Sequence, residues 1–408
     1  MNTTTAPIFS LPNDTPASAR QLLGLLRRIR HGTLTIQCPD GSSQQFGSGE
    51  GLHGTLILRN WAPCAAALKS GDIGFAEAFM AGDWASPNLV DLLRVLVANR
   101  REMEDVIYGH WLGRLAYRVR HWMNRNTRSN SAKNIHAHYD LGNLFYELWL
   151  DPSMNYSSAW FDGNPQQSLV QAQQAKMARA LRMAGVTPGA SQRVLEIGCG
   201  WGAVAELGAR EFGAQMTGVT LSKAQLAYAQ QRLSDQGLQA DLRLQDYRDI
   251  PDEPFDAICS IEMLEAVGQA YWPQYFATLS RLLKPGGRAC IQTIVIEDSL
   301  FERYIQGTDF IQQYIFPGGC LPCPREFVKQ AQAAGLEVRD AFSFGHDYAE
   351  TLRRWREQFL SEREQVLQLG FDERFMRTWE FYLAYCEAAF WERNTDVLQY
   401  TLLKPGKA

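Results

Sequence analysis

The chain has 408 residues and a formal net charge of −4, and 46% of its residues are hydrophobic. This length predicts two or three domains, each able to bury its own core. The slightly negative charge argues against a protein that binds nucleic acid chiefly by neutralising phosphates. The polar start Met1–Thr5 lacks the features of a signal peptide, and no run of about 18 apolar residues occurs, so we expect a cytoplasmic protein with no transmembrane segment.

Cysteine usage fits the same compartment. Eight cysteines are scattered between Cys38 and Cys386 and form no disulfide framework, as expected in a reducing environment. Cys320 and Cys323 make a lone C-x-x-C without a second pair. We therefore expect no metal site.

The N-terminal part, residues 1–125, predicts a separate, smaller α+β domain. A polar, unpatterned segment around 124–131 follows, so we place a linker at 126–135 and a catalytic domain at 136–408. The elements expected in the first domain are strands over Gly32–Gln37 and Gly54–Arg59 and helices over Pro16–Arg30 and Leu89–Asn99.

The segment Trp111–Arg128 has the pattern of an amphipathic helix. Its basic residues recur at steps of four, three and four, and Trp111 and Trp122 lie on another face. The basic face is made of Arg114, Arg118, His121 and Arg125. Such a helix suits a membrane surface with anionic headgroups. A solvated helix that packs its tryptophans on the first domain remains the alternative.

From Val194 onward short β-rich runs alternate with helical patterns, which predicts a doubly wound α/β sheet. The seven candidate strands are Val194–Gly198, Met216–Thr220, Asp241–Leu244, Asp256–Ile261, Arg288–Ile296, Leu336–Ala341 and Val397–Leu403. Lys284–Gly287 predicts a turn before the fifth strand. Helical patterns over Tyr348–Leu369 and Phe371–Asn394 form an insertion before the last strand, a cap suited to a long apolar substrate.

The first of these strands runs into a glycine-rich loop, Val194–Gly202, with the spacing G-x-G-x-G and Glu196 before it. The dinucleotide fingerprint is G-x-G-x-x-G with an acid about 20 residues later, and Gly218–Ser222 at that place contains no acid. The loop resembles the first motif of class I methyltransferases that use S-adenosylmethionine (SAM). An ordinary glycine turn between strand and helix is the alternative.

Several further blocks resemble the family of cyclopropane-fatty-acyl-phospholipid synthases and mycolic acid cyclopropane synthases. These blocks are His138–Asn143, Leu150–Ser158, Val194–Gly202, Gly218–Ser222, Ile315–Gly319 and Tyr382–Cys386. In addition, Gly71–Met80 looks like the N-terminal domain of the members that act on phospholipids, a domain that the mycolic acid branch lacks.

The resemblance implies a seven-stranded class I methyltransferase fold with helical cap insertions and an enzyme that uses SAM as its cosubstrate. The expected reaction adds a methylene carbon to a cis double bond in an unsaturated phospholipid acyl chain and closes a cyclopropane ring. A C-methyltransferase that leaves a methylene or methyl branch is the alternative, and a non-catalytic SAM-binding protein at lipid surfaces is a second. The resemblance also implies a homodimer and a peripheral position at the inner face of the membrane.

The same resemblance assigns a SAM site. The expected cofactor-binding residues are Tyr156, Ser157, Leu195, Glu196, Gly198, Cys199, Gly200, Trp201, Gly202, Thr220, Leu221, Gln225, Tyr247 and Arg248.

It also assigns the residues that handle the proton lost when the ring closes. In the family a bound bicarbonate ion takes that proton, and Glu265, Tyr348 and the backbone of Ile294 match its ligands. Glu262 competes with Glu265 for the role of the acid. Two residues depart from the family: Gln292 stands where histidine is common, and Ser158 where cysteine is common. Glutamine can donate a hydrogen bond to the anion but cannot titrate, and serine retains the backbone amide that the ion uses in the family, so the balance between ring closure and other routes stays open.

Cys386 matches a late cysteine long treated as an active-site candidate in the family. The chemistry needs no nucleophile, and a cysteine among apolar residues is often a small core residue. Both interpretations stay open.

Overall fold

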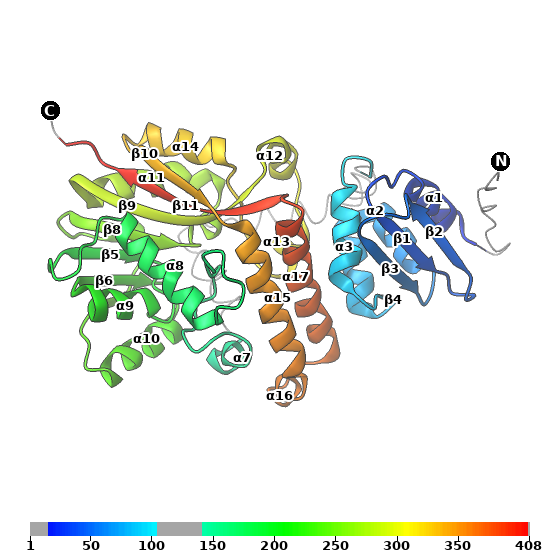
Figure 1. The fold of residues 1–408 in the computed structure, drawn as a ribbon, viewed down its shortest axis with the longest axis horizontal. Helices are drawn as coiled ribbons and strands as arrows, with labels where there is room; N and C mark the ends of the chain where they lie inside the picture. Colours follow the sequence, from blue (N-terminus) through cyan, green and yellow to red (C-terminus); the bar gives the residue numbers. More distant parts are fainter. Residues whose placement is uncertain (1–14, 104–140, 407–408) are drawn as a thin grey trace. The chain divides into compact units, whose positions relative to one another are not determined.

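The computed structural model describes residues 15–103 and 141–406, and these form two compact units (Figure 1). The first unit holds the described residues up to 103 together with 372–392, and the second holds 141–371 and 393–406. The predicted linker 126–135 and the predicted basic helix Trp111–Arg128 lie outside the described residues.

The first unit contains a four-stranded sheet in the order β2-β1-β3-β4. Strand β1 pairs antiparallel with β2 and parallel with β3, and its buried side chains Leu34 and Ile36 alternate with more exposed ones. The strands and helices are β1 (Thr33–Gln37), β2 (Ser43–Gly47), β3 (His53–Leu58), β4 (Trp84–Ala85), α1 (Ala17–Leu26), α2 (Ala62–Ala81), α3 (Leu89–Ala98) and α17 (Glu373–Trp391). The sequence analysis anticipated α1, α3, β1 and β3 and missed α2, β2 and β4.

Helix α17 lies far along the chain from the rest of this unit, yet it packs on α2 and α3. Arg94 of α3 donates to Glu392 at 2.7 Å, and the ring of Phe381 lies 5.7 Å from that of Phe79. The second of the two helical patterns expected before the last strand therefore belongs to the first unit.

The second unit is built on a seven-stranded sheet in the order β10-β11-β9-β8-β5-β6-β7. Its strands are β5 (Arg193–Ile197), β6 (Gln215–Thr220), β7 (Asp241–Leu244), β8 (Phe255–Ile261), β9 (Leu283–Ile296), β10 (Glu337–Ser343) and β11 (Thr395–Leu403). The strands run parallel, except that β11 is antiparallel to both of its neighbours. All seven predicted strands are present, which confirms the predicted fold class.

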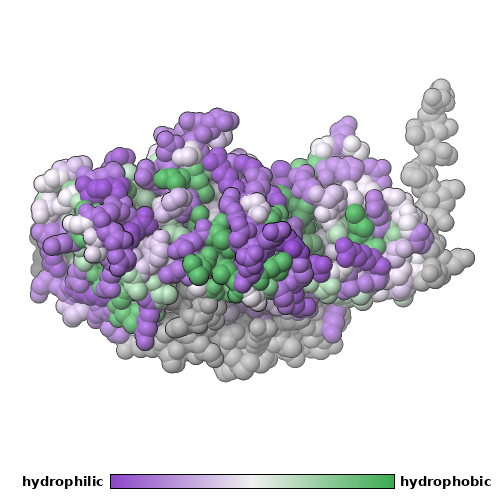
Figure 2. Space-filling view, turned by 90° about the horizontal axis from the view of Figure 1, so that it is seen from below, coloured by the Kyte–Doolittle hydropathy of each residue, from purple (hydrophilic) through white to green (hydrophobic). Residues whose placement is uncertain are grey.

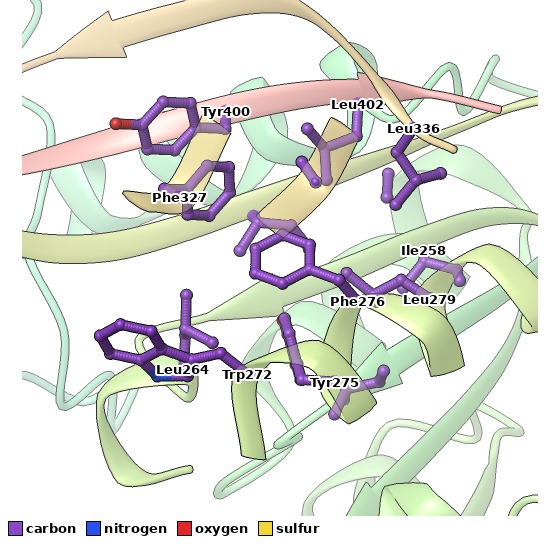
Figure 3. Packing of buried hydrophobic residues seen from close by; sticks show 14 of the residues in the cluster. Ile258, Leu264, Trp272, Tyr275, Phe276, Leu279, Phe327, Leu336, Tyr400 and Leu402 are labelled. Atoms are coloured by element: carbon purple, nitrogen blue, oxygen red, sulfur yellow. The ribbon is translucent and has the colours of Figure 1, made fainter. Parts of the chain in front are cut away.

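Helices cover both faces of this sheet. Consecutive residues of its central strands point to opposite sides and are therefore buried under different helices. Val194 belongs to one buried cluster and its neighbour Leu195 to the other. Figure 3 shows the cluster that contains Leu195. In it the ring centroids of Phe327 and Tyr400 lie 3.8 Å apart in a stacked pair, and those of Phe327 and Phe276 lie 5.1 Å apart in an edge-on pair.

The remaining elements described in the second unit are α-helices and three single-turn 3-10 helices. They are α7 (Asn143–Glu147), α8 (Leu169–Met183), α9 (Ala203–Phe212), α10 (Lys223–Asp235), η1 (Tyr247–Asp249), η2 (Leu264–Ala266), η3 (Gln269–Tyr271), α11 (Trp272–Leu282), α12 (Asp298–Ile305), α13 (Phe310–Tyr314), α14 (Pro324–Ala333), α15 (Gly345–Ser361) and α16 (Arg363–Gln368).

One local prediction is wrong. Lys284–Gly287 does not form a turn that separates a helix from the fifth strand, because β9 begins at Leu283, directly after α11. These residues extend the strand: Gly286 donates to the carbonyl of Lys404 at 2.8 Å, and Lys404 donates back to Gly287 at 3.0 Å. A Cβ at Gly287 would lie 2.9 Å from the carbonyl oxygen of Asp256, so glycine permits this close approach.

The face drawn in Figure 2 is mainly hydrophilic, with smaller hydrophobic areas between the polar ones. Large hydrophobic side chains that are exposed in the described part of the chain stand singly, at Leu144, Leu244 and Leu369. Within the described ranges, no helix combines the length and the apolar character needed to cross a membrane.

Candidate active site

The glycine-rich loop between β5 and α9 is shaped by left-handed backbone. Gly198, Gly200 and Gly202 have φ angles of 86°, 50° and 86°. A Cβ on Gly202 would lie 2.8 Å from the Cβ of Ala229 on α10. The loop therefore needs glycine both for its dihedral angles and for its packing.

A cavity of about 170 Å³ lies at the carboxyl ends of β5, β6, β7 and β8. This edge is where open α/β sheets bind their ligands. Twelve of the residues expected to bind the cofactor line it: Tyr156, Ser157, Glu196, Gly198, Cys199, Gly200, Trp201, Thr220, Leu221, Gln225, Tyr247 and Arg248.

The two other expected residues lie behind the wall of the cavity. Leu195 is fully buried in the core, and Gly202 packs against α10. Other wall residues were not anticipated, among them Met154, Asn155, Asp246 and Met263. Met154 lies in the block Leu150–Ser158, but its place on the wall depends on its own left-handed backbone, with φ of 53°, which the sequence does not show.

Polar and aromatic groups on the wall fit a ligand that carries both polar and cationic parts. Glu196 is buried, and burial raises its pKa to about 8. Within the described part of the chain its Oε2 atom has no hydrogen-bond partner, so it is available to a donor on a ligand. The ring of Tyr156 is held 5.4 Å from Trp149 and 5.6 Å from Trp355, and aromatic faces of this kind stabilise cations.

Glu262 directly follows β8, and its carboxyl group accepts hydrogen bonds from three surrounding donors. Its Oε1 atom accepts from the backbone amide of Ser158 at 2.8 Å and from Nε2 of Gln292 at 2.7 Å. Its Oε2 atom accepts from the hydroxyl of Tyr348 at 2.6 Å. Three groups that the resemblance assigned to a bicarbonate ion therefore donate to a side chain of this protein.

The backbone at Glu262 is unusual as well. Its φ angle is 50°, a left-handed value that non-glycine residues rarely adopt. The surrounding hydrogen bonds hold it there, and such conformations cluster at functional sites.

Glu265 lies one turn further on, in η2. The backbone amide of Ile294 donates to its Oε1 atom, and its buried Oε2 atom has no hydrogen-bond partner among the described residues. Burial, together with the neighbouring Glu262 carboxylate, raises the pKa of Glu265 to about 8.

The two carboxyl groups therefore divide their roles. Burial also raises the pKa of Glu262, but Lys176 and three hydrogen bonds oppose that shift. Glu262 therefore has more neighbours that favour its ionised form, whereas the pKa of Glu265 is raised to about 8. Glu262 is the stronger candidate for a base.

Lys176 on α8 was missed by the sequence analysis. It is fully buried, and its Nζ atom donates to Oγ of Ser157, a cavity residue, at 2.6 Å. The available signal was its position: it shares a helical face with Ala172 and Ala180, which are also fully buried. A lysine at such a position needs a partner.

The structure thus brings Ser158, Gln292 and Tyr348 together around Glu262, and Ile294 together with Glu265. Cys386 is half-buried on α17, in the first unit, whereas the residues lining the cavity belong to the second. Its role stays a prediction.

The sheet order, the glycine loop and the cavity define the class I SAM-dependent methyltransferase fold. A solved structure of mycolic acid cyclopropane synthase CmaA1, complexed with SAH and CTAB, matches with a TM-score of 0.62 and 31% identity, over 67% of this chain and 98% of that one. The chain belongs to the mycolic acid cyclopropane synthetase family, whose family model matches residues 126–400.

Two curated relatives show the range of the family. Tuberculostearic acid methyltransferase UfaA1 of Mycobacterium tuberculosis is 39% identical over 96% of this chain and 92% of its own length. Cyclopropane-fatty-acyl-phospholipid synthase of Escherichia coli is 35% identical over 81% of this chain and 83% of its own length. The family thus joins lipid methyltransferases with cyclopropane synthases.

Proposed function

We propose that this protein transfers a methyl group from SAM to a cis double bond in a phospholipid acyl chain and that Glu262 takes up the proton released. The product is then a methylene-branched acyl chain. The observation that carries this proposal is the Glu262 carboxylate, which fills the place where Ser158, Gln292 and Tyr348 were expected to hold an anion. The similarity to UfaA1, named as a methyltransferase, supports it.

The proposed reaction needs no reactant besides SAM and the alkene. SAM supplies the methyl cation equivalent, and the double bond supplies the electron pair for the new carbon–carbon bond. The adjacent carbon of the acyl chain becomes a carbocation, and a hydride shift moves the charge to the methylated carbon. Loss of a proton from the added methyl group leaves a C=CH2 branch on the open acyl chain, and the proton passes to Oε1 or Oε2 of Glu262.

The residues of this chain serve that sequence in three ways. The glycine loop and Glu196 bind the donor, and the close packing of the loop fixes its position. Tyr156 presents an aromatic face to positive charge. Three donors hold the carboxyl group of Glu262, so the base is oriented before the proton is released.

Ring closure is the second candidate, because the same cation can lose a methyl proton and form a cyclopropane. The resemblance of the blocks and the similarity to the Escherichia coli synthase favour it. The resemblance assigns Glu265 and the backbone of Ile294 to the proton transfer that accompanies ring closure. The contact between these two residues is the geometric feature that supports ring closure.

Expression in a host rich in cis-monounsaturated phospholipid separates these products. We expect the acyl chains to gain one CH2 by mass spectrometry and to give a ketone on ozonolysis, because a methylene branch is still an alkene. A CH2 gain in a chain that resists ozonolysis would instead identify the cyclopropane. Unchanged acyl chains, with a folded protein that binds SAM by calorimetry, would contradict both reactions and favour a non-catalytic SAM-binding protein.

A further inference from the structure

The buried amino group of Lys176 has no part in the proposed methyl transfer, yet it lies beside the machinery. It donates to Ser157 Oγ at 2.6 Å, and Gln173 on the same helix donates to the carbonyl of Ser157 at 2.8 Å. The next residue, Ser158, presents its amide to Glu262. Helix α8 therefore fixes the segment that carries one of the three donors to Glu262.

The backbone of Lys176 is tied to a second donor. Gln399 on β11 donates through Nε2 to the carbonyl of Lys176 at 3.2 Å and to Oε1 of Gln292 at 3.0 Å. Gln292 in turn donates to Glu262. Two hydrogen-bonded routes thus connect one lysine to the same carboxylate.

The charges around this lysine are mostly negative. Three acidic side chains face it: Glu262 at the end of β8, Asp151 in the loop after α7 and Glu196 on β5. Of the three, Glu262 does most to raise the pKa of the lysine. Glu262 itself faces Glu265 and the hydroxyl of Tyr348. A positive charge on Lys176 thus favours the ionised form of Glu262.

We propose that Lys176 is a positioning residue whose positive charge keeps Glu262 ionised and whose contact with Ser157 holds the Ser158 amide against it. The proposal rests on the proposed function, since it assumes that Glu262 takes up the proton. Lys176 touches neither substrate in this account and acts through Glu262.

The proposal predicts a particular pH dependence of kcat. Burial lowers the pKa of Lys176 to about 8, so the lysine loses its charge as the pH rises through that value. While it is charged, the lysine favours the ionised form of Glu262 and opposes the rise that burial causes in the pKa of that carboxyl. We expect kcat to fall at low pH as Glu262 is protonated, and this acid limb to move to higher pH when the charge of Lys176 is removed.

The test compares kcat against pH for the wild type, Lys176→Met and Lys176→Arg. Lys176→Met removes the charge, so we expect kcat at pH 7 to fall by about tenfold or more, as for a shift of one pKa unit in the base, and the acid limb to move to higher pH. SAM affinity by calorimetry should change by less than about threefold, since Lys176 does not line the cavity. Lys329→Met, at a lysine on α14 with 67% side-chain exposure, is the control and should match the wild type.

Lys176→Arg keeps the test decisive if Lys176→Met fails to fold. A guanidinium stays charged at every accessible pH, so the acid limb of Lys176→Arg should stay where the wild type has it. An unchanged acid limb in Lys176→Met, or an acid limb moved to higher pH in Lys176→Arg, would overturn the proposal, provided that the wild type forms the CH2-bearing product. A wild type that folds and forms no such product would overturn the proposed function itself.

Discussion

Replacing Glu262 by glutamine is expected to lower kcat by about 10²- to 10⁴-fold, the usual contribution of a positioned general base. Glutamine has nearly the same shape, so the packing around Ser158, Gln292 and Tyr348 is preserved, but the amide cannot take up a proton. SAM affinity should stay within about threefold of the wild type, because only the proton acceptor is lost. Single-turnover measurements of product, with calorimetry on the same samples, check both statements.

Glu265→Gln is the matched comparison, one turn away in the same pocket. Its carboxyl is already protonated at neutral pH in this account, because its pKa is raised to about 8. A neutral amide therefore imitates its working state, and we expect the loss of kcat to be at least about tenfold smaller than for Glu262→Gln. A larger loss for Glu265→Gln would make Glu265 the base.

Glu262→Gly is expected to be rescued by small oxyanions. The φ angle of 50° at this position suits glycine, so the substitution should not destabilise the fold through the backbone. It leaves three donors, on Ser158, Gln292 and Tyr348, around a place vacated by a carboxylate. Bicarbonate or formate should raise kcat of this variant by about tenfold or more, a fraction of the general-base contribution.

Chloride should not rescue Glu262→Gly, because it cannot accept the proton. The control is Glu262→Gln, in which the amide still fills the place and should exclude the added ion. Equal stimulation of both variants, or of neither, would show that the three donors do not form an anion site when Glu262 is absent.

The fold was largely predictable because its signals are local. The central strands of the second unit, such as β5 and β8, are buried and largely apolar. The loop Gly198–Gly202 is marked by glycines that left-handed dihedrals require. Lys284–Gly287 misled the prediction because proline and glycine also occur at strand ends, where close backbone approach favours glycine. Strand β2 was missed because Ser43–Gly47 buries only Phe46 and has no clear alternation.

The sequence predicted which residues belong to the site, but it did not predict how they are arranged. Family resemblance brought Ser158, Gln292 and Tyr348 together, although they lie far apart in the sequence, and the structure places them around one point. The left-handed backbone of Glu262 directs its carboxyl group toward these three donors. The group at the centre of the site therefore depends on this dihedral angle. Sequence shows no dihedral angle, so Glu262 remained one of two possible acids.

Lys176 illustrates the same limit. A lysine in an otherwise amphipathic helix normally places its charge in water, and only the packing of α8 against the loop at Ser157 shows it to be fully buried. The grouping of α17 with the first unit is likewise invisible in sequence, since its contacts join residues such as Arg94 and Glu392, nearly 300 positions apart.

The central claim, that a side chain of this protein replaces a bound anion as the proton acceptor, is tested most directly by the bicarbonate dependence of the wild type. Product formation should be measured in CO2-free buffer and again after bicarbonate is added at constant pH and ionic strength. The structure predicts the same kcat in both, because Glu262 already occupies the donors. A kcat that collapses without bicarbonate and recovers with it would contradict the account.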